Sequence, residues 1–234
     1  MYLPALISAL MLNCFAGVSE YSFEGVSDDE WNEAAGQIVE RREIWHHVFH
    51  SLEVDPFEAE AIIFPEVLRW SGLKNSVEQA ALRMFYIRDG KEGADFSIGL
   101  FQMKPSFAEK IECEWMNCPL RHVYRLYFGN IDDRHTRKER LDRLSDEQWQ
   151  CVYLAMFMRL LLYKESSLAC MDPAERIALM ATAYNRDPDA SLDQLRQYSK
   201  VRSFHFDLIP SSGTEYFSYQ ELSVDWYNHI SNNL

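Results

Sequence analysis

The hydrophobic positions in most of the chain repeat with the period of an α-helix. The first example follows Ser27-Asp-Asp-Glu30, where apolar side chains keep a helical period from Trp31 to Leu52. This spacing places them on one face of a helix. The four residues before them have a capping-box pattern, in which the serine and the glutamate each bind a free backbone N–H at the helix start. The sequence therefore predicts a helix that begins just after Ser27.

Similar start signals divide the rest of the chain into helices. Asp55-Pro56 and Asp172-Pro173 each combine an N-cap residue with a proline at the first helical position. Ser76-Val-Glu-Gln79 and Ser145-Asp-Glu-Gln148 have the capping-box pattern, and Lys104-Pro105-Ser106 marks another start. The segment after Gln148 is apolar around most of its circumference, so we expect it to form the central core helix.

The helical pattern breaks in two regions. Asp89-Gly90 and Gly93 interrupt it, and the stretch from Ala94 to Met103 reads as irregular or as a short hairpin. The polar run from Asp132 to Arg143 mixes both charge signs and is typical of a solvated helix or loop. Convincing alternating strands are absent. The predicted fold class is therefore all-α, with at most a small β-hairpin near residues 94–103.

The composition is that of one compact, acidic domain. Of the 234 residues, 47% are hydrophobic and 25% are charged, which allows a substantial core. The formal net charge is -13. An acidic surface repels phosphate backbones, so nucleic acid is not an expected partner. We expect residues 17–234 to form a single domain that is monomeric.

The N-terminal stretch, residues 1–16, is apolar and uncharged and ends at the small residue Ala16. It is too short to span a bilayer as a helix and is typical of a secretory signal peptide, although no Lys or Arg lies near Met1. The alternatives are a lipid-attachment site at Cys14 and a buried N-terminal helix. The signal-peptide interpretation predicts an exported protein, in the periplasm or at the cell envelope.

Four cysteines follow this stretch, at positions 113, 118, 151 and 170. In an exported chain they permit two disulfides with three possible pairings, and free buried thiols are the alternative. Zinc is not expected, because no Cys-x-x-Cys pair is present.

No metal and no cofactor is predicted. Glu43, His46 and His50 share a helix face at a spacing that can bind a metal, but a partly exposed polar face explains them as well. The tryptophans at positions 70, 115 and 149 could stack on sugar rings, although in an aromatic-rich helical domain such residues are mostly core. No glycine-rich phosphate loop stands out.

Three short stretches carry the candidate chemistry. In chain order they are Ala61-Ile-Ile-Phe-Pro-Glu66, Asp95-Phe-Ser-Ile-Gly-Leu-Phe-Gln-Met-Lys-Pro105 and Ala181-Thr-Ala-Tyr-Asn185. Together they resemble the lysozyme-like lytic transglycosylases and goose-type lysozymes. The resemblance covers residues 56–186. Each motif alone is weak, and the three in order are moderately specific.

The resemblance implies a lysozyme-like helical domain that cleaves peptidoglycan. The bond would be the β-1,4 link between N-acetylmuramic acid and N-acetylglucosamine. Glu66 matches the family's catalytic glutamate, and Gln102 matches a glutamine in the substrate cleft. Tyr184 matches a tyrosine close to the glutamate, and Asn185 matches its neighbouring asparagine. The implied partners are peptidoglycan glycan strands, with envelope proteins as further candidates.

Physical chemistry favours a catalytic role for Glu66. Cleavage of a glycosidic bond needs an acid that protonates the leaving oxygen. A glutamate at the end of an apolar helix is partly desolvated, which disfavours its charged form and raises its pKa. Pro65 lacks a backbone N–H, so we expect it to kink the helix and aim Glu66 into a groove.

The loop after the second break supplies the other candidates. Gly99 lets the backbone approach a sugar or take a special φ, and Ser97 can bind polar groups near the scissile bond. Asp95 is the candidate second carboxylate that an inverting hydrolase needs, and it can equally cap a turn. A lytic transglycosylase uses the glutamate alone and forms a 1,6-anhydro product. The sequence leaves both reactions open, with a lean to the transglycosylase.

Two positions depart from the family pattern. Val67 follows the glutamate where many members have serine, and Arg186 follows the Tyr-Asn pair where glycine is common. These departures affect substrate-binding details and leave the proton donor in place. They also admit an alternative function, an inactive protein that binds glycan or an envelope partner on a lysozyme-like scaffold.

Overall fold

The computed structural model describes residues 23–70, 76–129, 131–207 and 210–232, with only the backbone described for residues 76–79. Within these residues the chain forms ten α-helices, two short 3-10 helices and no β-strand. The all-α prediction is confirmed for this part of the chain, and the signal-peptide prediction for residues 1–16 lies outside it. The elements are α2 (Asp28–Ser51), α3 (Pro56–Trp70), α4 (Ser76–Asp89), η2 (Gly90–Glu92), α5 (Pro105–Asn117), α6 (Leu120–Val123), α7 (Arg134–Leu144), α8 (Glu147–Lys164), η3 (Ser166–Cys170), α9 (Pro173–Asn185), α10 (Leu192–Tyr198) and α11 (Tyr219–Ser231).

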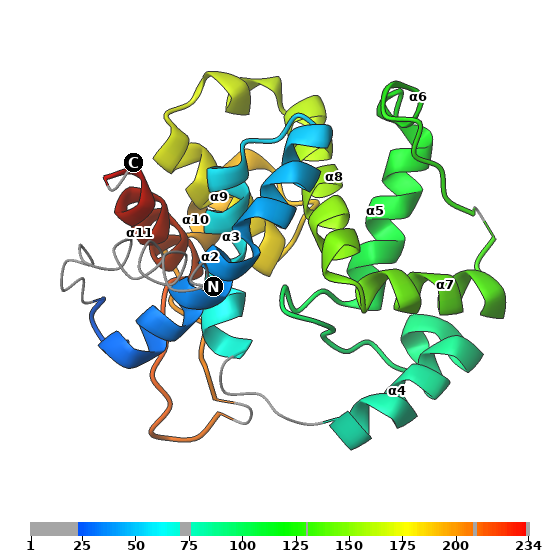
Figure 1. Cartoon of the computed structure of the whole chain (residues 1–234), viewed down its shortest axis with the longest axis horizontal. Coiled ribbons are helices and arrows are strands. Elements are labelled where there is room, and N and C mark those ends of the chain that lie inside the picture. Colours follow the sequence, from blue (N-terminus) through cyan, green and yellow to red (C-terminus); the bar gives the residue numbers. More distant parts are fainter. Residues whose placement is uncertain (1–22, 71–75, 130, 208–209, 233–234) are drawn as a thin grey trace, which may run out of the picture.

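Helix α3 is the centre of one group of helices, in which α2, α9 and α11 pack around it (Figure 1). Every residue from Ala59 to Leu68 is buried. A helix that is apolar around most of its circumference has to be enclosed in this way. Phe64 of α3 stacks on Trp226 of α11 with ring centroids 4.4 Å apart, and Trp31 of α2 lies 4.6 Å from the same phenyl ring. This dense packing fixes the position of α3.

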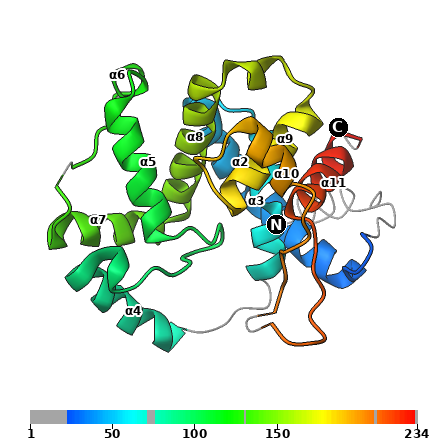
Figure 2. The ribbon, with the colours of Figure 1, turned by 180° about the vertical axis from the view of Figure 1, so that it is seen from behind.

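A second group consists of α4, α5 and α7, which lie together on the other side of the molecule (Figures 1 and 2). Helix α5 packs on α7 and α8, while α8 also packs on α2 and so joins the two groups. The sequence predicts the central core helix at residues 149–161. Helix α8 is largely buried, as predicted, but α3 is enclosed more completely.

Most of the predicted helix starts are confirmed. Ser27 forms the predicted capping box, and Asp55 and Asp172 accept hydrogen bonds from backbone N–H groups at the starts of α3 and α9. The capping box predicted at Ser145 is wrong. Asp146 is the N-cap of α8, while the Ser145 hydroxyl donates to a carbonyl in the last turn of α7. Short polar side chains suit both ends of helices, so the pattern alone does not separate them. The side chains of the capping box predicted at residues 76–79 lie outside the described part.

In place of the hairpin predicted near residues 94–103, the structure has a single isolated β-bridge. Ile98 and Met103 exchange two backbone hydrogen bonds of 2.9 and 3.1 Å around a tight turn. A second bridge joins Phe204 to Phe217. These two isolated bridges are the β pairing found in the described residues.

The polar run at residues 132–143 is not simply solvated. It forms most of α7, and Arg140 is buried there with Glu112 of α5, at 2.8 Å between Nη2 and Oε2. Arg143 binds the other oxygen of Glu112, also at 2.8 Å, and Tyr86 accepts a 2.6 Å hydrogen bond from Arg140. The sequence shows the charges but not their distant partners, which is why burial was missed. Pairing makes the burial of these ions tolerable.

All four cysteines in the described residues are free. Cys118 and Cys151 are buried, and Cys113 and Cys170 are exposed. The alternative of free buried thiols is therefore right for Cys118 and Cys151, but it is wrong about burial for Cys113 and Cys170. Burial raises the pKa of the Cys151 thiol. In the described part of the chain, no helix has both the length and the apolar character needed to cross a membrane.

Candidate functional site

A pocket of about 800 Å³ lies between the two groups of helices. Helix α3 and the C-terminal end of α9 form one side of it. The loop before α5 and the first turns of α5 form the other side. Its lining includes most of the residues predicted from the sequence, namely Glu66, Asp95, Ser97, Gln102, Tyr184 and Asn185. Residues brought from three separated stretches therefore meet at one place.

Glu66 lies within α3 rather than at its end. The helix continues through Pro65 and runs to Trp70, so the sequence-based placement of the acid at the end of the segment is wrong. Proline removes one helical hydrogen bond, but dense packing on all sides can outweigh that loss. Glu66 is only 6% exposed, although it lines the pocket.

The carboxyl of Glu66 is poorly solvated and weakly compensated. Burial is the main influence and raises its pKa from 4.5 to about 7, against the lowering effects of Arg69 and Lys104. Within the described residues, its buried Oε2 has no partner with hydrogen-bond geometry. Arg69 Nη2 nevertheless lies 3.0 Å from Oε2 and forms an ion pair with it. A carboxyl in this state is about half protonated near neutral pH.

Arg69 was not predicted from the sequence. It lies three residues after Glu66 on the same helix, a spacing that places two side chains on one face. Its guanidinium also lies 5.2 Å from the ring centroid of Phe204, in the segment before α11. The i, i+3 spacing is the signal that could have found it, but most such pairs are surface ion pairs.

Asp95 lines the pocket with a carboxylate that already has two partners. Ser106 donates to it twice, from the backbone N–H at 3.0 Å and from the hydroxyl at 2.7 Å. Ser106 is in the first turn of α5, and the N-cap residue Lys104 makes no side-chain cap. Asp95 therefore caps α5 from a distance, which corresponds to the capping alternative. Its catalytic role stays a prediction.

Gly99 has a structural reason to be glycine. Its φ is +69°, and an added Cβ would lie 1.5 Å from Nε2 of Gln150. The special φ expected from the sequence is confirmed, but the close approach is to a buried side chain of α8. Gly99 is not among the residues that line the pocket. Gln102, which also has a positive φ of 51°, donates from Nε2 to the Gly99 carbonyl at 2.8 Å.

Gln150 of α8 binds the backbone of this turn, and no sequence pattern identified it. Its Oε1 accepts a 3.0 Å hydrogen bond from the Phe101 N–H, and its Nε2 donates to the Leu144 carbonyl at 2.6 Å. Buried backbone groups need such partners. The available signal was its position, because Gln150 directly precedes the apolar run from Cys151 to Met158 in α8.

Tyr184 connects α9 to the same turn. Its hydroxyl donates to the Phe101 carbonyl at 2.7 Å, and its ring packs against Phe107 and Phe157. Burial raises the pKa of Tyr184 well above its usual value, and the charge of Glu66 adds to the effect. Tyr184 is therefore a neutral, fixed neighbour of the acid.

Tyr219 of α11 is a further neighbour that the sequence did not identify. Its hydroxyl donates to the Ile62 carbonyl of α3 at 3.0 Å, one helical turn before Glu66. Burial raises its pKa well above the usual value, with contributions from Glu66 and Tyr184. This hydrogen bond joins α11 to α3 one turn before the acid.

The lining of the pocket is rich in positive charge. Its cationic side chains are Arg69, Lys91, Lys104, Lys110 and Arg186, and its acidic ones are Glu66 and Asp95. The chain as a whole carries a net charge of -13. The net charge of the pocket lining is therefore positive, whereas that of the whole chain is negative.

The other candidates from the sequence lie elsewhere. His46 Nε2 is 2.6 Å from Oε1 of the buried Glu60, and no group of three or more metal-binding side chains occurs in the described residues. The tryptophans at positions 70, 115 and 149 do not line the pocket. Trp115 is buried and its indole N–H donates to a backbone carbonyl, as a core residue does.

Comparisons with known proteins do not assign a family. No protein-family model, curated protein or solved structure matches the chain.

Proposed function

We propose that the chain is a peptidoglycan-cleaving glycosidase on a lysozyme-like helical scaffold. It would cut the β-1,4 bond between N-acetylmuramic acid and N-acetylglucosamine. The observation that carries this proposal is the state of Glu66, a buried carboxyl with a pKa of about 7 that lines a pocket of about 800 Å³. The order of the three motifs around that pocket supports it.

Glu66 would act first as an acid and then as a base. In its protonated form it donates a proton to the glycosidic oxygen as the bond to the anomeric carbon breaks. The departing sugar keeps that proton as a hydroxyl hydrogen, and Glu66 is left ionised. The nearby charge of Arg69 stabilises the ionised form, because the two groups lie 3.0 Å apart. The carboxylate can then accept a proton in the second step.

The bonding of Asp95 favours the lytic transglycosylase reaction over inverting hydrolysis. A general base has to bind and activate a water molecule. Both oxygens of Asp95 already accept hydrogen bonds from Ser106. In the transglycosylase reaction Glu66 instead accepts the proton of the sugar's own 6-hydroxyl, whose oxygen attacks the anomeric carbon and gives a 1,6-anhydro product.

The remaining pocket residues would bind the glycan. Ser97, Gln102 and Asn185 offer donors and acceptors to sugar hydroxyl and acetamido groups. Tyr184 is a positioning residue, because its hydroxyl is bonded to the turn that carries Gln102. An exported protein, in the periplasm or at the cell envelope, follows from such a substrate together with the signal peptide predicted at residues 1–16.

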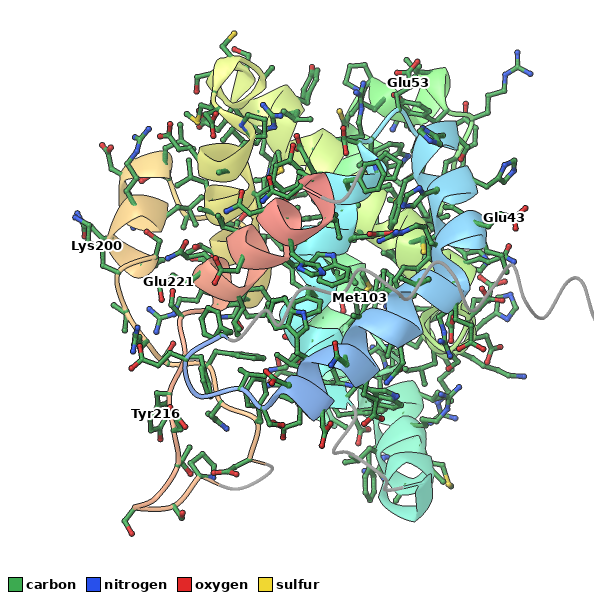
Figure 3. All side chains as sticks on the ribbon, turned by 60° about the vertical axis from the view of Figure 1, so that its left-hand side comes forward. Glu43, Glu53, Met103, Lys200, Tyr216 and Glu221 are labelled. Atoms are coloured by element: carbon green, nitrogen blue, oxygen red, sulfur yellow. The ribbon has the colours of Figure 1, made fainter. Side chains whose placement is uncertain are left out.

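The test is the release of soluble fragments from purified peptidoglycan by the wild type and by Glu66→Gln. We expect Glu66→Gln to reduce turnover by at least about a hundredfold, because it removes the acid. Glu43→Gln is the matched control, since Glu43 is exposed on α2 (Figure 3) and is not among the residues that line the pocket. Mass spectrometry of the fragments should find 1,6-anhydro ends. Unchanged turnover in Glu66→Gln would sink the proposal, and reducing ends would indicate hydrolysis.

A second candidate function is glycan or envelope binding without cleavage. The ion pair between Arg69 and Glu66 favours it, because a permanent cation beside the acid lowers its pKa and so opposes the protonated form that cleavage needs. Val67 and Arg186, the departures from the family pattern, are consistent with it. In that case peptidoglycan would bind to the wild type, and no soluble fragments would appear.

A further inference from the structure

The five cationic side chains of the pocket differ in whether they already form an ion pair with an acidic side chain. Arg69 pairs with Glu66, and Lys110 pairs with Asp189 and, at 3.8 Å, with Glu114. Lys91 and Lys104 are exposed, and neither forms an ion pair with another described residue. Arg186 is exposed as well, but its Nη2 donates to Ser203 at 3.0 Å and its guanidinium lies over the ring of Tyr198. Lys91 and Lys104 are therefore the two pocket cations whose charge is most available to a ligand.

These two lysines flank the residues proposed to hold the glycan. Lys91 lies in η2 and Lys104 is the N-cap residue of α5, so Ser97 and Gln102 lie between them along the chain. All four residues line the same pocket. A ligand held by Ser97 and Gln102 would therefore have a positive charge within reach.

The N-terminus of α5 is not free to bind an anionic ligand. A helix N-terminus attracts negative charge, but here the Asp95 carboxylate already occupies it through Ser106. Attraction of an anion thus depends on the side-chain cations. A recessed site concentrates their field, and the surrounding acidic surface makes the contrast larger.

We propose that the pocket selects glycan strands that carry carboxylates over neutral glycans with the same linkage, and that Lys91 and Lys104 determine this selection. The inference rests on the proposed function, because it assigns the chemistry of the substrate at the same site. Carboxylates can come from two sources, the lactyl group of a stem-free strand or the acidic groups of an attached peptide. Lysine is suited to either, because it acts as a point charge without a fixed geometry.

The test measures binding by Glu66→Gln, which does not cleave the ligand. Three soluble β-1,4 glycans of equal length serve as probes: an N-acetylglucosamine oligomer, a stem-free strand with lactyl carboxylates, and the same strand with its peptides. We expect at least one acidic strand to bind about tenfold more tightly than the neutral oligomer at low salt, with the difference shrinking at high salt. The acidic strand that binds better identifies the source of the carboxylate.

Adding Lys91→Gln and Lys104→Gln should remove most of this difference by weakening the binding of the acidic strands much more than that of the neutral oligomer. The matched control is Lys138→Gln with Lys200→Gln, which changes the net charge equally at exposed positions outside the pocket. Equal affinity for all three glycans, absence of binding to any of them, or an equal loss in the control would overturn the inference. Cleavage plays no part in these measurements, so failure of the proposed reaction would show separately in the fragment-release assay.

Discussion

The carboxyl of Glu66 is subject to two opposing influences. Burial removes water from it and raises its pKa, while Arg69 and Lys104 favour the charged form. Burial is the larger influence, and the resulting pKa of about 7 is one at which a group can both donate and accept a proton. An exposed glutamate on the same helix would not have this property.

The raised pKa of Glu66 predicts a loss of stability as the pH rises. The folded protein binds this proton more tightly than the unfolded chain, so the stabilisation is complete below pH 4.5 and is lost as the pH rises through about 7. Glu66→Gln cannot ionise and should escape the loss. By pH 8 the variant should have gained about 3 kcal/mol relative to the wild type, because the pKa of Glu66 rises from 4.5 to about 7 on folding. Urea denaturation of both proteins between pH 5 and 8 measures this difference, and a difference that does not change with pH would contradict the account.

At the scale of elements, the turn at residues 98–103 depends on side chains from two other helices. Gln150 of α8 accepts a hydrogen bond from the Phe101 N–H, and Tyr184 of α9 donates one to the Phe101 carbonyl. Sequence patterns found the turn, the glycine and most of the helix starts, because these are local. They did not find Gln150 or Asp95 as partners of the turn and of α5, because those contacts join residues 49 and 11 positions apart.

Gly99→Ala should disrupt this turn. Its φ of +69° disfavours any Cβ, and the new carbon would collide with Nε2 of Gln150. We expect the variant to lose about 2 to 4 kcal/mol of stability, since both strain and broken buried hydrogen bonds contribute. Gly36→Ala is the matched control: nothing lies within 4 Å of its added Cβ, so it should gain up to about 1 kcal/mol in the middle of α2. Thermal unfolding of the two variants tests this, and equal melting temperatures would refute it.

At the scale of the whole molecule, the pocket exists because two groups of helices meet around the turn at residues 98–103. One group supplies Glu66 and Tyr184, and the other supplies the loop before α5 and the lysines of the pocket. The sequence predicted the convergence of the three motifs through a family resemblance. It could not show the positive pocket in an acidic chain, since the cations are spread from residue 69 to residue 186.

The proposed cleavage depends on Glu66 acting as an acid in the intact protein. The most direct measurement is the initial rate of fragment release from purified peptidoglycan as a function of pH. We expect the rate of the wild type to fall above an apparent pKa of about 7, because the protonated form of Glu66 is the one that donates. Glu66→Gln should be nearly inactive throughout. A wild-type rate that stays constant from pH 6 to 9, or a Glu66→Gln variant with wild-type turnover, would contradict the central claim.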